Sequence, residues 1–108
     1  MSEKIKKTDR TINTTAKVGD KAYGFRLFNG SEMSARFPDG VYIVVDPEMV
    51  PVHESFVLAI HEGAAMFRQL IVQGGKRFLK AMDARYPLLP MGKKDLILAV
   101  AIETNMRL

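Results

Sequence analysis

The sequence predicts a small, mainly β protein that forms a single domain, and three observations support this fold class. Short apolar runs recur after residue 21, each bounded by glycine, proline or charged residues, a pattern typical of strands and turns. Two of these runs, Val41–Val45 and Phe56–Ile60, are apolar at every position, as expected of strands covered on both faces. The chain has 108 residues, of which 47% are hydrophobic, and this is enough for one compact core.

The first two expected strands are Tyr23–Phe28 and Val41–Val45. The segment between them ends in the turn signal Phe37-Pro38-Asp39-Gly40, and Asp46-Pro47 ends the second strand. Because Val41–Val45 has no polar face, we expect it in the core.

The next three expected strands, Phe56–His61, Ala64–Val72 and Arg77–Ala81, should form two hairpins. Their connections, His61-Glu62-Gly63 and Gln73-Gly74-Gly75-Lys76, are short and contain glycine, as hairpin tips do. A helix remains an alternative for part of Ala64–Val72.

The last expected strand, Leu96–Asn105, is apolar through Ile102 and mixed afterwards. A strand of this kind either packs within its own sheet or offers its edge to a second subunit.

The net charge of +4 is concentrated at the start of the chain. Residues 1–21 hold six basic and three acidic residues, whereas the other 87 hold ten and nine. Residues 1–21 are therefore expected to be a linker or a flexible basic arm that could touch DNA phosphates, and residues 22–108 to be the folded domain. That domain is a poor candidate for gripping nucleic acid with its own surface.

Several classes of function are disfavoured by composition. The absence of cysteine excludes disulfides and thiolate chemistry, and no apolar run is long enough to span a membrane. His53 and His61 lack the spacing of a metal-binding motif, so neither a metal nor another cofactor is expected. A cytoplasmic protein without membrane contact is the expectation.

The segment FNGSEMSARFPDG, residues 28–40, resembles the nucleophile motif of the LexA, UmuD and phage-repressor family of S24 peptidases, V-x-G-D-S-M-x-P-x-F-P-D-G. The residues in register are Gly30, Met33, Phe37, Pro38, Asp39 and Gly40. Residues 65–80 resemble the family's lysine strand and the hairpin after it, and Asp83-Ala84-Arg85-Tyr86-Pro87 resembles its N-P-x-Y-P segment. The order and spacing of three blocks make the resemblance specific, and it implies a small domain of twisted antiparallel sheets.

The departures from the family motif affect its catalytic pair. Glu32 occupies the position of the nucleophilic serine, and Arg68 that of the lysine that deprotonates it. A buried lysine can act as a neutral base, but a guanidinium stays protonated. In addition, the chain contains no Ala-Gly or Cys-Gly dipeptide, the usual cleavage site of the family. The resemblance therefore implies a domain that is not an active enzyme.

Two consequences follow for these positions. Glu32 and Arg68 replace groups that lie within hydrogen-bond reach in the family, so we expect them to form an ion pair. Ser31 is an alternative nucleophile only after a one-residue shift, which would reverse the direction of its side chain and leave Arg68 as the base.

The resemblance implies the C-terminal assembly domain of a CI-type lysogeny repressor of an enterobacterial phage, acting in the bacterial cytoplasm. Its expected partners are further copies of itself in dimers and higher oligomers, operator DNA through an N-terminal helix-turn-helix domain that this chain lacks, and an antirepressor protein that releases it. The candidate residues for the dimer contact, with core packing as the alternative, are Leu98, Val100, Ile102, Thr104 and Met106. Two other functions remain open: an active self-cleaving peptidase and a stand-alone protein-binding domain.

Overall fold

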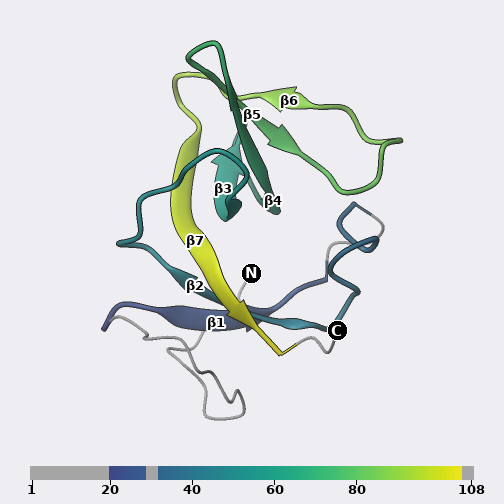
Figure 1. Cartoon of the computed structure of the whole chain (residues 1–108), viewed down its shortest axis with the longest axis vertical. Helices are drawn as coiled ribbons and strands as arrows, with labels where there is room; N and C mark the ends of the chain where they lie inside the picture. The colour runs from purple at the N-terminus through teal and green to yellow at the C-terminus, as the bar shows by residue number, and fades with distance from the viewer. Residues whose placement is uncertain (1–19, 29–31, 106–108) are drawn as a thin grey trace.

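The computed structural model describes residues 20–28 and 32–105, and the described residues fold as one antiparallel sheet (Figure 1). Its strands are β1 (Tyr23–Arg26), β2 (Tyr42–Asp46), β3 (Phe56–His61), β4 (Ala64–Gln73), β5 (Lys76–Lys80), β6 (Leu89–Pro90) and β7 (Leu96–Thr104). The order across the sheet is β1-β2-β7-β3-β4-β5-β6. The mainly β fold class is confirmed.

The six expected strands are all present; Phe56–His61 has the expected bounds, and the other five have ends shifted by one or two residues. Tyr23–Phe28 ends at Arg26, although the Leu27 amide still donates to the Val41 carbonyl oxygen. The helical alternative for Ala64–Val72 is wrong, because this segment pairs with β3 on one side and β5 on the other. The two-residue strand β6 was not expected, since its length leaves no periodicity in the sequence.

Both hairpin tips lie where the sequence places them. The turn between β3 and β4 has positive φ at Glu62 (50°) and Gly63 (83°), and the turn between β4 and β5 has positive φ at Gly74 (58°) and Gly75 (76°). Positive φ at both central residues matches the right-handed twist of the strands that such a turn connects.

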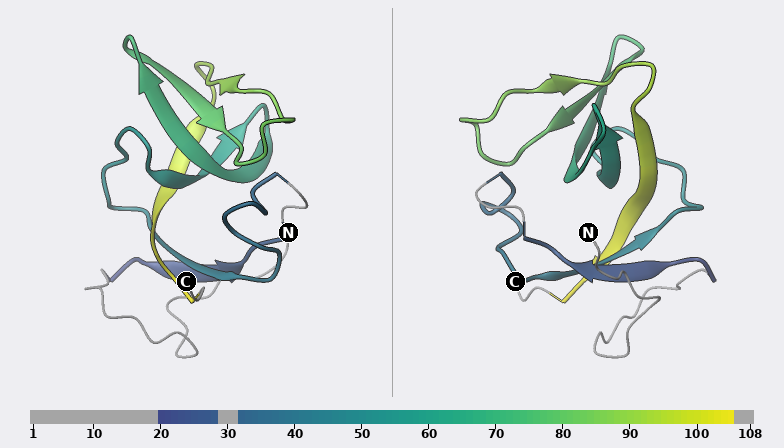
Figure 2. Two further views of the ribbon diagram at one scale, coloured as in Figure 1. Left: turned by 45° about the vertical axis from the view of Figure 1, so that its right-hand side comes forward. Right: turned by 180° about the vertical axis from the view of Figure 1, so that it is seen from behind.

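The last strand in chain order, β7, lies in the middle of the sheet. Its second half, Val100–Thr104, pairs with β2, and its first half pairs with β3. Figures 1 and 2 show β7 running from the hairpins of β3, β4 and β5 to the pair of β1 and β2, so that it connects these two groups of strands. β7 therefore packs within its own sheet.

The core divides along the two faces of the sheet. The largest cluster gathers apolar side chains from β1, β2 and the loop before β2 around Phe67 of β4. A second cluster, around Val57 and Leu70, lies on the other face of β3 and β4. Edge-to-face contacts join Phe67 to Phe25 and Phe37, with centroids 6.1 and 5.3 Å apart.

The expected arm, residues 1–21, lies almost entirely outside the described residues, which begin with Asp20 and Lys21 in an exposed turn. Residues 20–28 and 32–105 contain no helix with the length and hydrophobicity needed to cross a bilayer.

Candidate functional site

Glu32 and Arg68 form the expected ion pair. The Nε and Nη2 atoms of Arg68 lie 3.3 and 3.2 Å from the two carboxylate oxygens of Glu32, so the contact is bidentate. Arg68 lies on β4 and its side chain is 4% exposed, whereas that of Glu32, in the loop before β2, is 25% exposed. Most of the guanidinium is thus withdrawn from water, and its charge is compensated by a partly solvated carboxylate.

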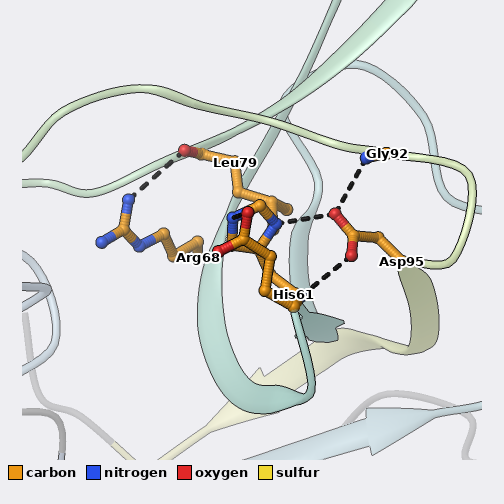
Figure 3. A network of polar contacts seen from close by, with 6 residues as sticks. His61, Arg68, Leu79, Gly92 and Asp95 are labelled. Atoms are coloured by element: carbon orange, nitrogen blue, oxygen red, sulfur yellow. Dashed lines mark hydrogen bonds and ion pairs between the residues drawn. The ribbon is translucent and has the colours of Figure 1, made fainter.

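The remaining donors of Arg68 bind backbone oxygens. Its Nη1 lies 3.1 Å from the carbonyl oxygen of Pro87 and 3.4 Å from that of Leu79 on β5, and Figure 3 shows the second of these contacts. Among the described residues, no fully buried side-chain nitrogen or oxygen lacks a hydrogen-bond partner. Arg68, 3% exposed, is the one charged residue of the described chain that is buried as a whole residue, and these contacts satisfy its hydrogen-bond donors.

Glu32 also binds through its backbone. Its carbonyl oxygen accepts hydrogen bonds from the amides of Met82 and Asp83, at 2.9 and 3.1 Å. Together with the contact between Arg68 and Pro87, these bonds fasten the loop before β2 to the segment after β5. The pair thus joins three parts of the chain that are far apart in sequence.

The arrangement joins a permanent cation to a carboxylate. Arg68 has no lone pair to accept a proton, because a guanidinium stays charged at any physiological pH. Glu32 offers a carboxylate that is already bound to that cation. Ser31, the alternative nucleophile, lies outside the described residues.

A second polar pair, His61 with Asp95, was not predicted from the sequence. Asp95 precedes β7, and its Oδ2 lies 2.6 Å from Nδ1 of His61 at the end of β3 (Figure 3). The same carboxylate accepts hydrogen bonds from the backbone amides of Glu62 and Gly92, and these bonds lower the pKa of Asp95 to about 2, with His61 adding to the effect. The pair therefore attaches the start of β7 to the tip of the first hairpin.

Neither histidine takes part in a metal-ligand cluster within residues 20–28 and 32–105. Nδ1 of His53 accepts a hydrogen bond from the Val72 amide, while His61 binds Asp95. Both rings are thus used in connecting strands and loops.

The five candidates for the dimer contact lie in different environments. Leu98 is 38% exposed, but Val100 is 4% exposed and packs in the cluster around Val57. Ile102 packs against the buried group of Ala22, Tyr42 and Val44, and the Thr104 hydroxyl donates to the Tyr42 carbonyl oxygen. Met106 lies outside the described residues.

A register shift separates Leu98 from Val100. Along β3, Leu58 pairs with Ala99 and the next residue, Ala59, pairs with Ile97, so β7 carries one extra residue at Leu98. One extra residue moves every following side chain to the opposite face of the sheet from the one that simple alternation gives. The side chain of Val100 therefore points into the core. Simple alternation along the strand could not reveal this change.

The comparison with known proteins gives one family. Residues 2–102 match the family described as Peptidase S24-like. An uncharacterized HTH-type transcriptional regulator of Coxiella burnetii is 34% identical over 76% of this chain. Repressor protein C2 of Salmonella phage P22 is 32% identical over 64% of the chain, and the prophage repressor CohE of Escherichia coli is 33% identical over 74%.

Regulators of mobile elements are also similar. The HTH-type transcriptional regulator for conjugative element SXT of Vibrio cholerae is 35% identical over 58% of this chain. The chain spans 38% of the Coxiella protein, 33% of the P22 protein, 36% of CohE and 30% of the SXT regulator.

Proposed function

Because the chain belongs to the Peptidase S24-like family, we propose that it is a repressor's assembly domain that no longer cleaves itself. The relatives are named as repressors and transcriptional regulators of phages and conjugative elements. A transcriptional repressor is thus the family role that best fits this chain, with the domain resembling the C-terminal half of a CI-type protein.

The bidentate contact between Glu32 and Arg68 carries the proposal of inactivity. Self-cleavage requires a nucleophile and a base that can exchange a proton, and this pair offers a carboxylate and a permanently charged guanidinium instead. Their bonds to Met82, Asp83 and Pro87 give the pair a structural task in place of a catalytic one.

Self-association is supported by two features of β7. β3 pairs with β7 only between Leu96 and Val100. Beyond Val100, β2 pairs with one edge of β7, and no described strand pairs with the other edge of Ala101–Thr104. Leu96 and Leu98, near the start of β7, are 56% and 38% exposed. An open strand edge and exposed leucines are suited to an isologous dimer contact.

We further propose that operator DNA is bound by a helix-turn-helix segment of the full-length repressor in the bacterial cytoplasm, since several relatives are named as HTH-type regulators. If self-cleavage is lost, release from DNA needs another trigger. An antirepressor protein that binds the repressor is the simplest one.

Sedimentation velocity over a hundredfold range of concentration tests the assembly role. The chain should sediment as dimers or larger species, and Leu98→Glu should shift it towards monomer because a charge would be buried in the contact. Val52→Glu is the matched control, since Val52 is also exposed (59%) but lies in the loop between β2 and β3.

Two results would contradict this proposal. A monomer at every concentration would leave a stand-alone binding domain as the better description. Accumulation of fragments when the protein is incubated at alkaline pH would support the alternative function, that of an active self-cleaving peptidase.

A further inference from the structure

A pocket of about 370 Å³ opens beside the segment that follows β5. Its lining residues come from β4, the end of β5 and that segment: Ile71, Lys80, Ala81, Ala84, Tyr86 and Leu88. Its volume is at the lower end of the range for ligand sites. Five of these six side chains are apolar or aromatic, so the pocket suits an apolar group.

The segment that forms one wall of the pocket is held in place. The Met82 and Asp83 amides donate to the Glu32 carbonyl oxygen, and Arg68 binds the Pro87 carbonyl oxygen. The Arg85 guanidinium binds the Asp83 carboxylate across the turn, with Nη2 and Oδ2 2.6 Å apart. A wall fixed in this way needs little ordering when a ligand binds, which favours affinity.

The strand and the segment that line the pocket are richer in basic than in acidic residues. Residues 76–88 contain four basic residues and one acidic residue, Asp83, which is bound to Arg85. Lys80 lines the pocket, and Lys76 lies on the same face of β5 because side chains alternate along a strand. Within the described residues no ion pair involves either lysine.

We propose that this pocket binds an acidic peptide of a partner protein. A large apolar side chain of the peptide enters between Ile71, Tyr86 and Leu88, and flanking carboxylates lie against Lys80 and Lys76. The apolar walls favour a peptide over nucleic acid, whose phosphates would need a track of cations rather than one apolar recess. β3 separates the pocket's strands β4 and β5 from β7, so the site is distinct from the proposed dimer contact.

The test uses a fluorescein-labelled peptide with a central phenylalanine and two glutamates on each side, titrated with the 108-residue chain in fluorescence polarisation. Saturable binding is expected. Replacing the glutamates by lysines, or the phenylalanine by alanine, should weaken binding at least about tenfold, which corresponds to ~1.4 kcal/mol.

Two variants locate the site. Lys80→Glu should weaken binding of the acidic peptide about tenfold or more, whereas Lys94→Glu, which makes the same charge change on an exposed residue outside the pocket lining, should change it less than about twofold. Ala84→Phe should weaken binding by filling the recess. If circular dichroism shows that Ala84→Phe is poorly folded, the comparison of Lys80→Glu with Lys94→Glu locates the site without it.

Any of three outcomes would overturn the proposal: no saturable binding of the acidic peptide, equal binding of the lysine peptide, or equal effects of Lys80→Glu and Lys94→Glu. Tighter binding of a DNA duplex than of the peptide, lost in Lys80→Glu, would also overturn it and assign the surface to nucleic acid. The sedimentation of Lys80→Glu should remain that of the unaltered chain, so a failure here is separate from a failure of self-association.

Discussion

The carboxylate of Asp95 lies 2.6 Å from the ring Nδ1 of His61, and this contact fixes the start of β7 to the hairpin formed by β3 and β4. Both side chains are largely withdrawn from water, at 6% and 11% exposure. The Glu62 and Gly92 amides complete the environment of the carboxylate and, with His61, hold its pKa at about 2.

Asp95 should therefore contribute to acid sensitivity. The pKa of Asp95 is about 2 in the folded chain and 3.8 in the unfolded chain. Its charged form therefore stabilises the fold fully at pH values above 3.8, and this contribution is lost as the pH falls through about 2. Asp95→Asn should lower the free energy of unfolding at pH 7, and the difference from the unaltered chain should shrink between pH 4 and 2. Urea denaturation at each pH measures it, with Glu48→Gln, an exposed carboxylate, as the control. A difference that does not change with pH would contradict this role.

The two variants of the ion pair should differ because each leaves a different charge behind. Glu32→Ala should lower the free energy of unfolding by about 3–5 kcal/mol, because it leaves the buried Arg68 guanidinium without its counter-ion. Arg68→Ala should cost less, about 1–3 kcal/mol, because it removes the bonds to Leu79 and Pro87 but leaves a carboxylate that is partly solvated. In urea denaturation the double variant should lose less than the sum of the two. Strict additivity would show that the pair is not coupled.

Gly24 should not tolerate a larger side chain. A Cβ added there would lie 2.5–2.7 Å from atoms of the Tyr42 ring and hydroxyl, and Tyr42 is 6% exposed. Gly24→Ala should therefore lower the free energy of unfolding by about 1–3 kcal/mol through overpacking. The same change should cost less in a Tyr42→Val background, where the ring is absent. An equal cost in both backgrounds would assign the effect to the backbone instead.

Restoring the family's catalytic residues should require both changes. Neither Glu32→Ser nor Arg68→Lys alone should cleave a supplied Ala-Gly peptide, because each leaves the nucleophile without a base or the base without a nucleophile. The double variant is the only one expected to show any cleavage, followed by mass spectrometry at alkaline pH. Cleavage by the unaltered chain would refute the proposed inactivity.

The sequence predicts much of this fold because its local signals are strong. Glycine at the second turn position marks both hairpin tips, and the fully apolar run Val41–Val45 lies in the core with every residue at most 8% exposed. The ion pair of Glu32 and Arg68 was predicted from one substitution in each of two motif blocks, and it is present. In each case the residues themselves carry the information.

The rest depends on pairing between distant segments. The bulge at Leu98 decides that Val100 is buried, and it arises from register with β3 rather than from β7 itself. The contact of His61 with Asp95 joins residues 34 positions apart and has no motif. Their partnership exists only once β7 lies beside β3.

The central place of β7 has a consequence for synthesis. β1 and β2 on one side and β3 to β6 on the other have no backbone ladder with each other, so the sheet is continuous only through β7. While β7 is still inside the ribosome, the nascent chain can form its hairpins but cannot close the sheet. Closure must therefore follow translation of Leu96–Thr104, and until then the unoccupied slot between β2 and β3 is open to the β7 of another chain.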